Sequence, residues 1–221
     1  MNKASKVVLI AVFVVLVVLL VGILFAISYA HLNRRQAERS LAVFQQIQVG
    51  TTDRATALQM TAAFRSHRSE WMAGEQPALE FSYDNRALFY LKLAPYTNFR
   101  ASIVSKGGTV VEKHASEFAA PGGCAVSVTE RRRGFGFSDG RAPAGHPNHI
   151  VHQNWNSPTS ARQAIIEDDD TYGEEQRCQD WNFNLSCLTR FAACDANVML
   201  PNVDPNFESR PSDRQARHDR L

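Results

Sequence analysis

An uninterrupted apolar run from Val7 to about Ala30 contains no charged residue. About 20 such residues, rising about 1.5 Å each as a helix, cross a hydrocarbon core of about 30 Å. A lone segment in lipid must pair its backbone groups internally, so it has to be helical. The pattern predicts a cytoplasmic stretch at 1–6 and a transmembrane signal-anchor helix at 7–30, which meets the lipid bilayer.

A cleaved secretory signal is the alternative interpretation of this run. Lys3 and Lys6 suit its basic start, and Ser28-Tyr29-Ala30 fits a small-x-small cleavage pattern. A cleavable apolar region is typically about 7–15 residues long, however. The longer run favours an anchor that stays attached.

Beyond the run, apolar residues recur at spacings of three and four, as on one face of a helix. They are Ala37, Leu41, Phe44 and Ile47. Gly50 is suited to end this helix, and Thr51, Thr52 and Asp53 offer N-caps for a second one over 54–65.

From position 78 onward, short runs rich in β-branched and aromatic residues alternate with turn signals. The runs read LEFSY, ALFYLKL, FRASIVS, TVVEKH and CAVSVTE. They predict an antiparallel sheet of four or five strands packed on the two helices. Lys106-Gly107-Gly108 predicts a hairpin over 103–111.

The last third of the chain has weaker patterns. A Gly-, Pro-, His- and Asn-rich stretch over 134–158 predicts a long surface loop. Ser157 before Pro158 predicts the start of a helical stretch, and Trp181, Leu185 and Leu188 predict an apolar side for a helix over 174–194. The fold class expected is α+β, with an extracytoplasmic domain over 31–200 that ends in helices and a disordered tail over 201–221.

A helix, then QVGTTDRATAL opening a second helix, then a strand meander resembles small bacterial envelope domains of the outer-membrane assembly lipoprotein E and β-lactamase-inhibitor-protein type. The resemblance covers about 37–130, and Val49, Gly50, Thr51 and Leu58 carry it. The lipidation cysteine and the Gly-x-Pro that often closes the second helix in those domains are missing. The resemblance implies a scaffold or binding module in a cell envelope.

All four cysteines follow the apolar run: Cys124, Cys178, Cys187 and Cys194. An even number outside the membrane suits a compartment that permits disulfides, and four cysteines allow three pairings. We favour a local bond, Cys187–Cys194 or Cys178–Cys187, with Cys124 joined to the remaining cysteine. Four reduced, buried thiols are the alternative, and zinc is disfavoured because the chain has no CxxC pair.

The cysteines also decide orientation. Lys3 and Lys6 before the run face Arg34, Arg35 and Arg39 after it, which is close to a tie under the positive-inside rule. A disulfide-permitting compartment places the domain outside the cytoplasm. We therefore expect a single-pass protein of the cell (inner) membrane.

Charge and motifs argue against a nucleic-acid partner. Without Lys3 and Lys6, 22 of the 24 basic residues remain against 22 acidic ones, so no basic surplus is available to contact phosphates. Arg133-Gly134-Phe135-Gly136-Phe137 matches only the first half of the RNA-recognition octamer. Ser138 and Gly140 break the second half.

Three histidines, His146, His149 and His152, form the most suggestive chemical cluster. Three imidazoles can hold zinc with an open fourth position. A spacing of three and three suits neither one strand nor one helix, so only a loop could make them converge. We expect no cofactor and a non-enzymatic binding or structural domain with a possible envelope protein partner. The alternative function is a membrane-bound metal-dependent hydrolase using these histidines.

Overall fold

In the computed structural model, residues 3–120, 124–132, 149–157, 160–169 and 181–201 are described. Helix α1 (Lys3–Gln46) is a single 44-residue helix that runs from the N-terminus onto the domain. Short elements follow it: α2 (Arg54–Met60), the 3-10 helix η1 (Ala62–His67) and, after two strands, α3 (Arg86–Tyr90). The α+β class is confirmed.

The described strands form one antiparallel sheet of seven strands in sequence order. The strands are β1 (Arg68–Ala73), β2 (Gln76–Asp84), β3 (Thr97–Lys106), β4 (Thr109–Ala119), β5 (Cys124–Arg132), β6 (His149–Ser157) and β7 (Ser160–Asp169). The predicted hairpin is the β3–β4 turn, where Gly107 and Gly108 adopt φ values of 57° and 83°. A two-residue turn with both φ values positive suits glycine, because it has no Cβ to clash.

The sheet has seven strands where four or five were expected, and the ALFYLKL run expected as a strand is instead α3 and the turn after it. Strands β6 and β7 correct two further predictions. Part of the expected 134–158 loop is β6, and the helical stretch expected after Ser157 is β7. Position 150 pairs with 131 of β5 and with 169 of β7, so both segments complete ladders begun by their neighbours. Ladder pairing overrides the weak local helix preference of the β7 sequence.

The helix expected over 174–194 is also wrong where the structure describes it. Residues 181–194 are mostly irregular, with one 3-10 helix, η2 (Leu185–Thr189), and α5 (Ala196–Met199) follows. The Cys187–Cys194 bond holds its Cα atoms 6.0 Å apart. Seven residues of α-helix would separate them by about 10.5 Å, too far for a disulfide.

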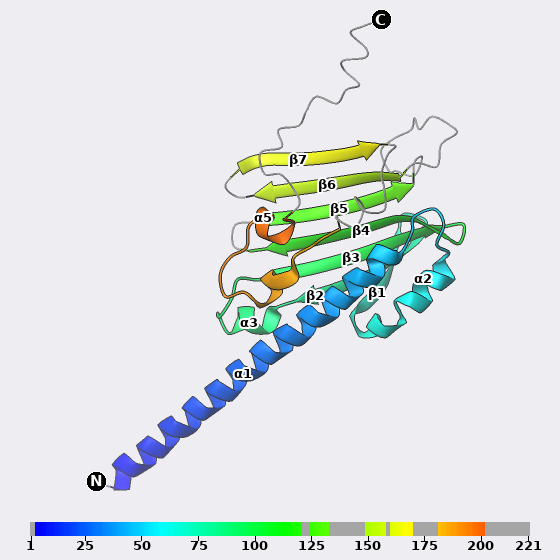
Figure 1. Cartoon of the computed structure of the whole chain (residues 1–221). Coiled ribbons are helices and arrows are strands. Elements are labelled where there is room, and N and C mark those ends of the chain that lie inside the picture. The colour runs from blue at the N-terminus through cyan, green and yellow to red at the C-terminus, as the bar shows by residue number, and fades with distance from the viewer. Residues whose placement is uncertain (1–2, 121–123, 133–148, 158–159, 170–180, 202–221) are drawn as a thin grey trace, which may run out of the picture.

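The helical elements cover one face of the sheet, as Figure 1 shows. The docked part of α1 and the 181–200 segment pack on inward-facing residues of β2 to β5. The largest of these buried side chains are Phe44, Phe81, Phe99, Tyr83 and Trp181. Of the described elements, none lies over the opposite face.

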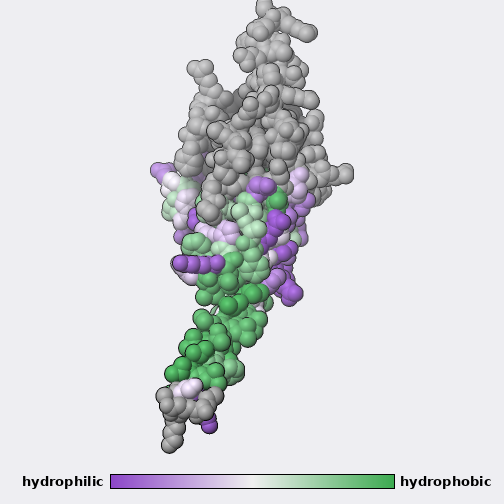
Figure 2. Space-filling view, turned by 90° about the vertical axis from the view of Figure 1, so that its left-hand side faces the viewer, coloured by the Kyte–Doolittle hydropathy of each residue, from purple (hydrophilic) through white to green (hydrophobic). Residues whose placement is uncertain are grey.

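Helix α1 has two environments along one backbone. Its large apolar side chains from Val7 to Leu24, apart from the half-buried Ile23, are exposed, whereas one side is buried from Ala26 onward. The buried positions repeat at helical spacing: Ala26, Ala30, Asn33, Ala37, Ser40, Leu41 and Phe44. Figure 2 shows the exposed part as a continuous hydrophobic column below the domain. This half is long and apolar enough to cross a membrane.

Candidate functional site: the seat of helix α1 on the sheet

The structure describes two of the three histidines that were predicted to bind metal. His149 and His152 lie three positions apart in strand β6, and His146 lies outside the described residues. Among the residues that the structure describes, no three His, Cys, Asp or Glu side chains form a metal-binding group. The RNA-like segment 133–137 and the tail 202–221 are also outside the described residues.

The cysteine prediction has a clearer outcome. Cys187 and Cys194 form a disulfide, the first of the two local pairings favoured from the sequence. It closes a loop beside the buried Leu185 and Leu188. Cys178 lies outside the described residues and Cys124 begins β5, so the long link between them stays a prediction.

The C-terminal end of α1 is fixed by a buried lysine that the sequence analysis did not single out. The Lys113 Nζ donates to the carbonyl oxygens of Ile47, at 2.9 Å, and Phe44, at 3.4 Å. The last carbonyls of a helix lack partners within it and carry partial negative charge. An ammonium group placed there therefore both caps the helix and offsets its dipole.

The same ammonium has two further contacts. Its Nζ lies 2.9 Å from Glu130 Oε2, and it sits 4.5 Å from the centre of the Trp181 ring. Lys113, Glu130 and Trp181 are all essentially without solvent contact. Losing one member of a buried pair costs far more than losing a surface ion pair, because it leaves an uncompensated charge. The contacts of Lys113 therefore join α1, the sheet and the C-terminal segment at one point.

Glu117 lies on the same face of β4, four residues beyond Lys113, but its surroundings differ from those of Lys113. It is fully buried, and among the described residues neither carboxyl oxygen has a hydrogen-bond partner. Burial raises the pKa of Glu117 well above its usual value, and the charge of Arg34 on α1 only partly opposes this. The protonated, neutral carboxyl is the form that this site favours.

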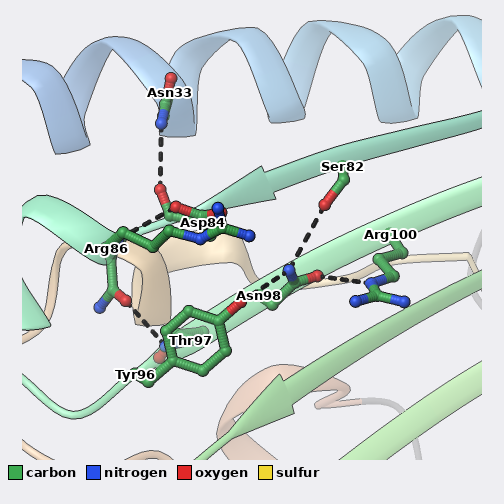
Figure 3. Close-up of polar contacts among 9 residues, drawn as sticks. Asn33, Ser82, Asp84, Arg86, Tyr96, Thr97, Asn98 and Arg100 are labelled. Carbon is green, nitrogen blue, oxygen red and sulfur yellow. Dashed lines mark hydrogen bonds and ion pairs between the residues drawn. The ribbon is translucent and has the colours of Figure 1, made fainter. Parts of the chain in front are cut away.

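We call the part of α1 that packs on the sheet, from Ala26 to Phe44, the docked half. At its other end, a polar network ties α1 to the sheet, as Figure 3 shows. The Asn33 Nδ2 donates to the carbonyl oxygen of Asp84 at 3.0 Å, and the Asp84 carboxylate pairs with Arg86 at 2.9 Å. The buried Asn85 side chain accepts from the Thr97 N–H and donates to the Pro95 carbonyl, both at 2.8 Å. These bonds fix both ends of the segment that carries α3.

The opposite face of strands β2 to β5 carries a group of small polar side chains. It carries Ser82, Ser102, Ser116, Ser127 and Thr129, all partly exposed. His114 lies in one register row with Thr129, and its Nδ1 is 2.8 Å from the Thr129 Oγ1. His152 pairs with Thr129 in the same row. Polar side chains predominate on this face of β2 to β5, where Ala78, Val104 and Val111 also form a small buried apolar cluster with Ala73. The α1-facing side is largely apolar.

No family model matches the chain. The curated proteins and the solved structures likewise give no match. A function for this chain therefore has to be argued from its own sequence and geometry.

Proposed function

We propose that this chain is a single-pass membrane protein whose domain lies outside the cytoplasm and acts as a binding or structural module of a bacterial cell envelope. One observation carries the proposal: the helix with the exposed apolar half is also the helix that the sheet packs against. A domain built in this way is held at one height and orientation above the bilayer.

Two further features support the proposed location. The Cys187–Cys194 bond suits an oxidising compartment, where such bonds persist. Lys3 and Lys6 precede the apolar half and suit a cytoplasmic amino terminus. The sheet face that no described element covers is where a partner would have access to the module. The resemblance of 37–130 to envelope domains points to the same setting.

A reporter fusion tests the location. Alkaline phosphatase needs its own disulfides, so it is active only outside the cytoplasm, and we expect activity when it is fused after Arg39. A reporter that works only in the cytosol, fused at the same residue, serves as the control. Activity of that control alone would reverse the proposed orientation.

Metal analysis of the purified full-length protein tests the module against the metal-dependent hydrolase. A binding or structural module is expected to carry no stoichiometric transition metal. Stoichiometric zinc that is lost on His149→Ala and His152→Ala, but retained on His114→Ala, would favour the hydrolase instead.

A further inference from the structure

The segment between β2 and β3 packs against α1 where the exposed half of the helix ends. Leu88 and Ala94 are buried with Ala26 and Ala30 of α1 in a small apolar cluster, separate from the main core. We name this segment, residues 86–94, the foot. The bond from Asn33 to the Asp84 carbonyl (Figure 3) holds the segment just before the foot, and the bond from Asn85 to the Pro95 carbonyl joins its two ends.

The foot directs large apolar side chains away from the protein. Phe89 is 43% exposed, Tyr90 74% and Leu91 44%. The rings of Phe89 and Tyr90 lie 5.8 Å apart, and Phe89 packs edge-on against Tyr96 at 5.7 Å. Elsewhere in the described part of the domain, exposed large apolar side chains occur singly or, at Trp71 and Met72, as a pair. The run of three in the foot is longer, which indicates a contact surface.

The height of the foot along α1 indicates what it contacts. If the hydrocarbon layer begins at Val7, a core about 30 Å thick extends about 20 residues along the helix, to Ala26. The foot touches α1 between Ala26 and Ala30, at that boundary. Tyr29 and Phe25 of α1 are exposed at the same level and stack with their ring centres 6.4 Å apart. Aromatic side chains concentrate at membrane interfaces in this way.

Lys92 supports the same assignment. The turn after α3 has the Schellman pattern, with the Leu93 N–H donating to the Leu88 carbonyl and the Lys92 N–H to that of Phe89. Lys92 occupies its left-handed position with φ of 57°, where glycine would avoid a cost of about 1 kcal/mol. An exposed lysine here, next to exposed aromatics, suits the headgroup region of a bilayer.

We infer that the foot, through Phe89, Tyr90, Leu91 and Lys92, is a second membrane contact that inserts its aromatic side chains at the headgroup–acyl boundary beside α1. The inference rests on the proposed membrane anchor. Figure 2 shows that the hydrophobic column of α1 continues onto the adjoining part of the domain. Because the domain is packed on α1, a second contact beside the helix limits the tilt of the whole molecule relative to the bilayer.

Photo-crosslinking of the full-length chain in phosphatidylcholine vesicles tests the inference. A diazirine amino acid replaces one residue per variant: Tyr90 in the foot, Leu16 in the middle of the apolar half, or Trp71. Trp71 is the control because it is an exposed aromatic residue of the domain, and its 46% exposure is close to that of Phe89, the site of a second foot variant. It pairs with Ala78, six residues along β2 from Asp84 and away from the foot. A near-ultraviolet circular dichroism spectrum that matches the wild-type protein reports that each variant is folded.

The expected result is lipid adducts from positions 90 and 16 and none from position 71. Adducts from position 16 without any from position 90 or from a second variant at Phe89 would overturn the foot and leave the anchor standing. The absence of adducts from both position 16 and position 90 would overturn the anchor and the inference together. A cross-link from position 90 to a second copy, without lipid, would make the foot a protein interface and contradict the inference. Adducts at all three positions would also contradict it, because contact would then not be specific to the foot.

Discussion

The two halves of α1 share one backbone but have opposite surroundings. From Val7 to Leu24, large apolar side chains point outward on every side, whereas from Ala26 to Phe44 only one side is apolar, and it is buried on the sheet. A helix that is apolar all round matches lipid, and an amphipathic one matches a protein core bordered by water. No turn or glycine break separates the two halves, so the side chains alone account for the change of environment.

Phenylalanines on either half allow this difference to be measured. Phe44 is completely buried and meets Phe81 edge-on, whereas Phe13 is exposed. Phe44→Ala is expected to lower the free energy of unfolding of the domain by about 3–5 kcal/mol, through lost burial and a residual cavity. Phe13→Ala should leave it within about 0.5 kcal/mol. Urea unfolding followed by near-ultraviolet circular dichroism would measure both, and equal losses would contradict the division of α1.

Lys113 anchors only the docked half, at its last carbonyls. Lys113→Ala is expected to cost about 3–5 kcal/mol, because Glu130 is left as a buried charge. Adding Glu130→Gln to this variant should restore part of the loss. A double-mutant cycle in urea measures the coupling between the two sites. Additive losses would mean that the two groups do not act as a pair.

The disulfide of the C-terminal segment, residues 181–200, is expected to contribute less to the stability of the domain than Phe44 or Lys113 does. Replacing both cysteines, Cys187→Ser with Cys194→Ser, should lower stability by about 2–3 kcal/mol, as chain entropy predicts for a short loop. Thermal unfolding with and without reductant measures it. A double variant that matched the oxidised wild-type protein would contradict a stabilising role.

Glu117 should make the docked half sensitive to pH in a defined direction. The pKa of Glu117 is higher in the folded state than in the unfolded state. Its contribution to the free energy of unfolding is therefore present in full at low pH and is lost as pH rises through the folded pKa. Glu117→Gln is expected to be more stable than wild type at pH 8. The two should converge toward pH 4.5, the usual value for the group. Unfolding curves across that range measure the effect, and a gap that widened toward low pH would show that the sign is wrong.

Much of α1 and its neighbours follows from local patterns. The sequence predicted the apolar half and the buried positions Ala37, Leu41 and Phe44. Of the three N-cap candidates that it offered, Asp53 is the one whose carboxylate accepts the Thr56 N–H, at 2.7 Å. It also predicted the glycine turn between β3 and β4. These features depend on residues near one another in the chain, where spacing and turn chemistry are informative.

The buried charges could not be predicted in the same way. Val110 and Lys113 are three residues apart in β4, yet both face α1, because the pairing with β3 shifts between Val104 and Ser105. Such a bulge resets the alternation of faces, so the period-two pattern does not reveal that Lys113 points inward. Strands β6 and β7 were missed for a related reason: their pairing partners, not their own composition, determine their structure.

The central claim is that α1 is one unbroken helix with lipid around its first half and the sheet beneath its second. Amide hydrogen exchange of the full-length chain in phosphatidylcholine nanodiscs tests it most directly at the junction, residues 25–33. Slow exchange there, continuous with slow exchange on both sides, is the expected result, because every amide is bonded within the helix. Exchange at the rate of unstructured peptide across 25–33 would show an anchor and a domain joined by a flexible linker, and would contradict the account.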